Sequence, residues 1–210
     1  MSTLVVAPKS NLDNVADWVS SANGRTLRVL NGFVTVREVL AQIASGQYRI
    51  IHFATHGCPA ALEMSDGAIP DHLLEDALRA AGRVDLVILG ACSSIAIGAQ
   101  LYMAGVQRVL SWRSEVTDKA AAEWARAFYA SLGISGDIWD AQVTAGEAVR
   151  RLGYEPPIFL NGRLSKLESQ VKALQRTSEV GGVPRWLAAV LIAYGALMLL
   201  LIGLLVQVLA

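Results

Sequence analysis

Two stretches of sequence decide the fold: YRIIHFATHG, from Tyr48 to Gly57, and VDLVILGACSS, from Val84 to Ser94. Each is a short apolar run rich in β-branched residues that ends in glycine and small polar residues. This pattern is typical of a buried strand that continues into a turn. Continuous apolar runs, without alternating polar residues, are typical of strands that are covered on both faces. We therefore predict two central strands of a parallel sheet.

The sequence on either side extends this sheet. Further strands are predicted at 3–7, 25–30, 108–112 and 156–162, the last at an edge, and helices at 11–21, 35–45, 71–81, 94–104, 118–132 and 136–152. A hairpin is predicted around LEMSDGAI, with Asp66-Gly67 at its tip. Strands that alternate with helices indicate an α/β fold with a doubly wound, mainly parallel sheet.

Two reactive side chains follow the central strands. The first strand ends at His56 and the second at Cys92. If the strands are neighbours, both side chains lie at the carboxyl edge of the sheet, where sites form in such folds. A thiol beside an imidazole is the arrangement that cysteine nucleophiles need. Ser93-Ser94 open the next predicted helix, whose N-terminus favours negative charge on the sulfur.

An oxyanion site is predicted beside this pair. Gly57 lets the backbone approach a substrate and offers its N–H group, and the N–H of Cys92 is a second donor. This chemistry requires no cofactor and no metal.

Four motifs, in order, resemble one family: HFATHG (52–57), LVILGACSS (86–94), AGVQRVLSWRSEVTD (104–118) and AFYASL (127–132). They resemble the CHAT domains, a branch of the caspase-like cysteine peptidases, and GACSS and VTDK are similar to the corresponding motifs of separase. The resemblance implies a caspase-like three-layer sandwich over residues 1–162. It also implies a catalytic dyad at His56 and Cys92, and proteolysis that is often controlled by a partner or a sensor domain.

Substrate preference is less clearly indicated. Some caspase relatives place an acid two residues before the cysteine to select a basic side chain, and here that position is Gly90. Glu115 and Asp118 are the remaining acids near the expected pocket, and Trp112 either lines the pocket or packs beneath it. The alternative for Asp118, which we favour, is that it caps the following helix.

The region contains a second histidine, His52, and a second cysteine, Cys58, for which several roles are considered. We predict that His52, inside the strand, is a packed histidine. His52, His56, Cys58 and Cys92 are nitrogen and sulfur ligands of the kind that zinc prefers, but their spacing lacks the usual CxxC pair, so we predict no metal site. A regulatory disulfide between Cys58 and Cys92 is a further alternative.

The chain of 210 residues consists of a long charged part and a short uncharged C-terminal part. Its 18 acidic and 18 basic residues all precede residue 186, and the zero net charge argues against a nucleic-acid partner. Residues 186–210 carry no charge and, as a helix, would extend roughly 37 Å, enough to cross a bilayer. We predict a single C-terminal transmembrane helix without a signal peptide, and the Lys/Arg excess of 163–185 places the preceding domain in the cytoplasm, at the inner membrane of a prokaryote.

The connector, residues 163–185, links the two parts. Its apolar residues Leu164, Leu167, Val171 and Leu174 have helical spacing, and Gly181-Gly182 and Pro184 predict a hinge. The whole chain is therefore expected to be a membrane-anchored cysteine endopeptidase that cleaves a protein substrate and is regulated by a sensor or activator on a separate chain. The alternatives are a catalytically inactive interaction module and an effector that disrupts membranes by oligomerising.

Overall fold

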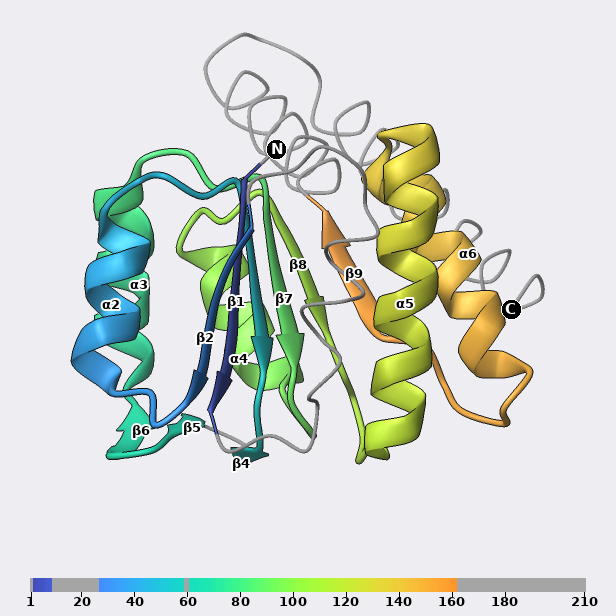
Figure 1. Cartoon of the computed structure of the whole chain (residues 1–210), viewed down its shortest axis with the longest axis horizontal. Helices are drawn as coiled ribbons and strands as arrows, with labels where there is room; N and C mark the ends of the chain where they lie inside the picture. The colour runs from blue at the N-terminus through green and yellow to red at the C-terminus, as the bar shows by residue number, and fades with distance from the viewer. Residues whose placement is uncertain (1, 9–26, 59–60, 162–210) are drawn as a thin grey trace, which may run out of the picture. The chain divides into compact units, whose positions relative to one another are not determined.

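The computed structural model of the chain describes residues 2–8, 27–58 and 61–161 (Figure 1). Its main sheet has six strands in the order β2-β1-β3-β7-β8-β9. Their bounds are β1 Thr3–Pro8, β2 Leu27–Gly32, β3 Ile50–Ala54, β7 Leu86–Gly90, β8 Arg108–Ser111 and β9 Ile158–Asn161. All neighbouring pairs are parallel except β8 with β9, which is antiparallel. The predicted mainly parallel sheet is confirmed.

Helices cover both faces of this sheet. Helices α2 (Val36–Ala44), α3 (Asp71–Ala81) and α4 (Ile95–Met103) lie on one face, and α5 (Asp118–Ser135) and α6 (Ile138–Arg150) lie on the other (Figure 1). Side chains of β3 alternate between the two cores: Ile51 and Phe53 belong to the first, Ile50 and Ala54 to the second. Because both faces are covered, the central strands are buried and, apart from His52 in β3, apolar.

A second, smaller sheet lies where the parallel strands end (Figure 1). It consists of β4 (Gly57–Cys58), β5 (Ala61–Met64) and β6 (Gly67–Ile69), all antiparallel. The predicted hairpin is its β5–β6 part, and β4 was not predicted. Asp66 does more than form the turn, because its Oδ1 accepts a hydrogen bond of 2.8 Å from the backbone N–H of Val36 at the start of α2.

Helix boundaries differ slightly from those predicted. The N-cap of α5 is Thr117, whose hydroxyl accepts from the N–H of Ala120, so the expected cap at Asp118 is wrong by one residue. Helix α5 ends at Ser135, and its C-cap Gly136 has a left-handed backbone (φ 69°), a conformation that glycine adopts without strain. Helix α6 starts at Ile138 rather than at 136. The helix predicted at 11–21 lies outside the described residues.

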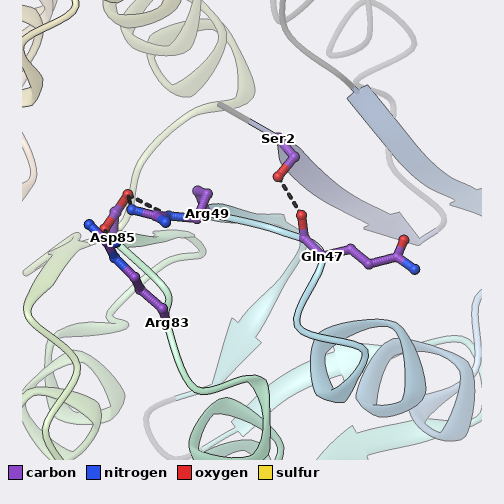
Figure 2. Close-up of polar contacts among 5 residues, drawn as sticks. All are labelled: Ser2, Gln47, Arg49, Arg83 and Asp85. Atoms are coloured by element: carbon purple, nitrogen blue, oxygen red, sulfur yellow. Dashed lines mark hydrogen bonds and ion pairs between the residues drawn. The ribbon is translucent and has the colours of Figure 1, made fainter.

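An ion pair fixes the beginnings of the two central strands. Arg49 Nε lies 2.7 Å from Asp85 Oδ2, and Arg83 lies 3.8 Å from the other carboxylate oxygen (Figure 2). The N–H of Asp85 also donates to the carbonyl of Arg49 at 2.8 Å. Nearby, Ser2 donates to the carbonyl of Gln47 and ties the N-terminal segment to the same edge (Figure 2). The contacts between Arg49 and Asp85 thus join the residues that precede β3 and β7.

The Arg49→Ala variant is expected to lose about 1 kcal/mol of unfolding free energy, because it leaves the mostly buried Asp85 carboxylate with only the more distant Arg83. Urea unfolding measures this loss. The matched control is Arg79→Ala, which removes an ion pair with Asp76 in which both side chains are 67% exposed. It should cost less than about 0.5 kcal/mol. Equal losses for the two variants would contradict the role given to Arg49.

The described residues all belong to one compact unit, Met1–Asn161. Within them, no helix has both the length and the apolar character needed to cross a membrane. The predicted connector at 163–185 and the predicted span at 186–210 lie outside the described residues, and both stay predictions.

Candidate active site

The turns that carry His56 and Cys92 touch each other. Strands β3 and β7 are paired, with Phe53 opposite Leu89 and Ala54 opposite Gly90, so both turns leave the same edge of the sheet. Gly57 lies against the second turn: a β-carbon on it would be 2.8 Å from Ala91 Cβ and 3.0 Å from the carbonyl oxygen of Cys92. Only glycine fits there without a shift of the neighbouring turn.

Cys92 lies in a strained turn between β7 and α4. The residue after it, Ser93, has a φ of 50°, the only positive φ of a non-glycine residue in the described part of the chain. Ser94 holds the turn, because its Oγ donates to the carbonyl of Leu89 and accepts from the N–H of Trp112, both at 3.1 Å. Backbone strain of this kind is concentrated at functional sites.

The segment between β8 and α5 binds the sulfur directly. The N–H of Val116 lies 3.4 Å from Cys92 Sγ, and the thiol lies 3.5 Å from the carbonyl oxygen of the same residue. The N–H of Ser93 donates to the carbonyl of Ser114 at 3.2 Å. Sequence reasoning did not identify Val116, because it acts through its backbone and leaves no signal in its side chain.

His56 is exposed and lies in the turn between β3 and β4, where its carbonyl accepts from the N–H of Glu63 at 3.1 Å. Within the described residues, no hydrogen bond joins its ring to Cys92, whose thiol is bonded to Val116 instead. In enzymes without substrate, catalytic hydrogen bonds are often long and tighten only in the complex. The dyad itself stays a prediction, although the turns that carry it are in contact.

The two predicted oxyanion donors lie on the facing turns. Among the described residues, none is seen to accept a hydrogen bond from the N–H of Cys92. Gly57 is in β4 and packs on the carbonyl of Cys92. Their role in binding an oxyanion stays a prediction.

A small cavity of about 10 Å³ lies beside the Cys92 turn. Its lining residues come from β3, β7, the end of β8 and α5: His52, Ala54, Gly90, Trp112, Ala121, Trp124 and Ala125. Trp112 is buried and forms part of this wall. Glu115 and Asp118, the two acids expected near the pocket, are exposed and do not line the cavity.

His52 is a packed histidine, as predicted. It is 3% exposed, and its Nδ1 lies 3.0 Å from the hydroxyl of Tyr129 on α5. Burial lowers the pKa of the imidazole to about 4, because water no longer solvates its charged form. The ring is therefore neutral at physiological pH.

Other candidate sites are weaker. No cluster of three or more metal-ligating side chains occurs within residues 2–8, 27–58 and 61–161, and Cys92 is a free thiol. A larger hollow of about 210 Å³ is lined by residues that include Arg79, Arg83 and Gln107. Arg83 and Gln107 precede β7 and β8, so this hollow lies at the amino edge of the sheet, away from Cys92.

Comparison with known proteins agrees with this architecture. The Arg-specific cysteine proteinase gingipain R superposes with a TM-score of 0.54 at 11% identity, over 70% of this chain and 42% of that one. A secreted C11 cysteine protease from Bacteroides thetaiotaomicron, solved with an irreversible peptide inhibitor, gives 0.51 at 12% identity, over 72% and 58%. The chain thus spans about half the length of these proteases, and the likeness concerns the fold.

Sequence comparison gives the family. None of the curated proteins compared with the chain matches it. The CHAT domain matches residues 4–151, which is more than half of the chain and includes both His56 and Cys92. The fold, a mixed α/β sandwich with a mostly parallel sheet, is the one found in caspase-like proteases. The chain therefore belongs to the CHAT domain family.

Proposed function

We propose that this protein is a cysteine endopeptidase that cleaves a protein substrate with the pair His56 and Cys92. The observation that carries the proposal is the contact between the two turns: Gly57 packs directly on Ala91 and on the carbonyl of Cys92. A half-buried thiol in a strained turn, with a histidine on the facing turn, is an arrangement suited to nucleophilic catalysis. Membership of the CHAT domain family supports it.

In this mechanism, His56 takes the proton of the Cys92 thiol, and the sulfur attacks the carbonyl carbon of the peptide. The N–H groups of Cys92 and Gly57 stabilise the oxyanion of the tetrahedral intermediate. The C–N bond breaks as His56 gives its proton to the leaving amine, which leaves a thioester on Cys92. His56 then removes a proton from a water molecule that attacks the thioester, and it returns a proton to the departing sulfur.

The activity is proposed to be anchored at a membrane and switched on by a partner. The uncharged segment 186–210 supports the anchor, and the basic excess in 163–185 supports a cytoplasmic domain. The contact of the thiol with Val116 supports the switch, because the sulfur must leave that carbonyl before it can give its proton to His56. In a prokaryotic cell this describes a regulated effector of defence or cell death.

The test of the pair is the rate at which iodoacetamide alkylates Cys92 in the full-length protein at pH 7, followed by mass spectrometry of the peptide that contains Cys92. In the His56→Ala variant we expect Cys92 to be alkylated at least about tenfold more slowly than in the wild type, because the base that generates the thiolate is gone. His72→Ala, which removes an exposed histidine on α3, is the matched control and should react like the wild type. Equal rates in all three proteins would show that the pair is not assembled.

Expression of the wild type and its variants in cells distinguishes the proposed peptidase from the two alternative functions. A peptidase creates new protein N-termini in cells that express the wild type, and these should disappear with Cys92→Ala. An inactive interaction module predicts a phenotype that survives Cys92→Ala. An effector that disrupts membranes predicts toxicity that survives Cys92→Ala but is lost when residues 186–210 are deleted.

A further inference from the structure

The amino edge of the main sheet, opposite the Cys92 turn, is where several helices end or begin. A helix that connects two parallel strands runs back from the carboxyl edge to the amino edge. Helix α4 does so, and it ends at Met103, shortly before β8. Helix α5 starts just after Val116, which contacts Cys92 Sγ, and its 18 residues extend about 27 Å, so it ends at the amino edge, where α6 begins (Figure 1).

Three large apolar side chains are exposed at these helix ends. Met103 is 84% exposed, Ile134 near the end of α5 is 90% exposed, and Trp139 in the first turn of α6 is 56% exposed. In the described part of the chain, Phe33 is the one other large apolar side chain that is more than half exposed, and it follows β2 at the carboxyl edge. Single exposed apolar residues are normal, but a group of them at one edge indicates an interaction surface.

Cations lie at the same edge. The hollow of about 210 Å³ is lined by the two residues that follow Met103 and, from the α3 side, by Arg79 and Arg83. Glu75 is the one acid among its lining residues. Arg83 is mostly exposed, and its Nε lies 3.8 Å from Asp85 Oδ1, a long contact that leaves the guanidinium able to bind a further anion. Guanidinium groups are well suited to phosphate oxygens.

The described part of the chain also ends at this edge. Strand β9 is antiparallel to β8, with Asn161 opposite Arg108, so β9 ends where the parallel strands begin. The sequence then continues through the basic connector 163–185 to the uncharged segment 186–210. Because a glycine hinge is predicted in the connector, the anchor alone does not orient the domain. The orientation depends on which surface of the domain contacts the bilayer.

On the basis of the membrane anchor in the proposed function, we infer that the amino edge of the sheet lies on the membrane, with Met103, Ile134 and Trp139 at the level of the lipid headgroups. Tryptophan and apolar side chains beside arginine are favoured at this level. The arginines of the hollow then meet phosphate groups, which every phospholipid carries. Since the five residues of β7 span roughly 17 Å, Cys92 faces away from the bilayer, toward substrates outside it.

Two acids beside Trp139 bear on the kind of lipid. Asp137 caps α6 and accepts from the N–H of Trp139 at 2.7 Å, and Asp140 lies in the first turn of the helix. The helix N-terminus offsets part of their charge, but a strongly anionic surface would repel them. The contact is therefore expected to rely on the apolar side chains and to form on vesicles of neutral phosphatidylcholine.

The experiment places a photo-crosslinking residue at each edge of the full-length protein. In one protein p-benzoylphenylalanine replaces Trp139, and in the matched protein it replaces Phe33, an exposed aromatic residue at the opposite edge. Both proteins are reconstituted in phosphatidylcholine vesicles and irradiated, and lipid adducts are measured by mass spectrometry. We expect at least about tenfold more adduct at position 139 than at position 33, because only the first is at headgroup level.

A pair of charge variants localises the contact. In the protein that carries the crosslinker at position 139, Ile134→Glu puts an anion on the proposed surface and should lower the lipid adduct at least about threefold. Phe33→Glu makes the same kind of change at an exposed apolar residue of the other edge and should leave the adduct unchanged.

Several outcomes would overturn the membrane-facing surface. Equal adducts at the two positions, or more at position 33, show that this edge does not face the lipid. Crosslinks from position 139 to a second copy or to residues 162–185, in place of lipid, show that protein covers it. Extraction with alkaline carbonate tests the anchor separately: a protein that stays in the vesicles with equal adducts keeps the anchor and contradicts only the surface, whereas release without adducts contradicts both.

Discussion

The free energy of unfolding of the Gly57→Ala variant is expected to be about 1–3 kcal/mol lower than that of the wild type. The added methyl group would lie 2.8 Å from Ala91 Cβ and 3.0 Å from the carbonyl oxygen of Cys92, distances that side-chain rotation cannot relieve. The two turns must therefore move apart. Because they carry His56 and Cys92, alkylation of Cys92 by iodoacetamide should also slow. Urea unfolding and the alkylation rate measure the two effects separately.

The control for this prediction is Gly146→Ala. Gly146 lies inside α6, and the atom nearest to its added β-carbon would be Pro156 Cβ at 3.4 Å, which is an ordinary contact. Alanine is favoured over glycine within a helix, so this variant should be neutral or more stable by up to about 1 kcal/mol. If Gly57→Ala were as stable as Gly146→Ala, the turns would not be packed as described.

The centre of the fold was predictable because its signals are strong and local. The apolar runs that end at His56 and Cys92 became β3 and β7, and they pair as neighbours, as the proposed pair requires. Strand β4 was not predictable, because two residues, Gly57 and Cys58, are too few to show a period. The antiparallel direction of β9 likewise leaves no trace in a run of four residues.

The site was predictable only in part, for a physical reason. Reactive side chains can be identified from residue type alone, so His56 and Cys92 could be selected from the sequence. The groups that hold the Cys92 turn are backbone atoms, those of Val116 at the sulfur of Cys92 and the carbonyl of Ser114 at the N–H of Ser93, and any residue carries those. The roles predicted for Trp112, Glu115 and Asp118 at a substrate pocket stay predictions; of these three residues, Trp112 lines the small cavity beside the Cys92 turn.

The buried ring of His52 makes the stability of the protein depend on pH. Its ring is buried between β3 and α5, against Tyr129 and the indole of Trp124. The folded protein takes up a proton there only near pH 4, whereas an unfolded chain does so near pH 6.5. Between these values the unfolded state binds more protons, so unfolding becomes more favourable as the pH falls.

The expected loss of stability from His52 is about 2 kcal/mol between pH 7.5 and pH 5, and it levels off at roughly 3 kcal/mol below pH 4. Urea midpoints measured at both pH values test it. Since other groups also titrate, the informative quantity is the difference between wild type and His52→Gln, which removes the titrating ring and should flatten the profile by that amount. His72→Gln removes a histidine whose side chain is 70% exposed, and it should leave the profile unchanged. A His52→Gln profile as steep as that of the wild type would mean that the folded protein admits a proton at His52 as readily as the unfolded chain does, and that the ring is not sealed from water.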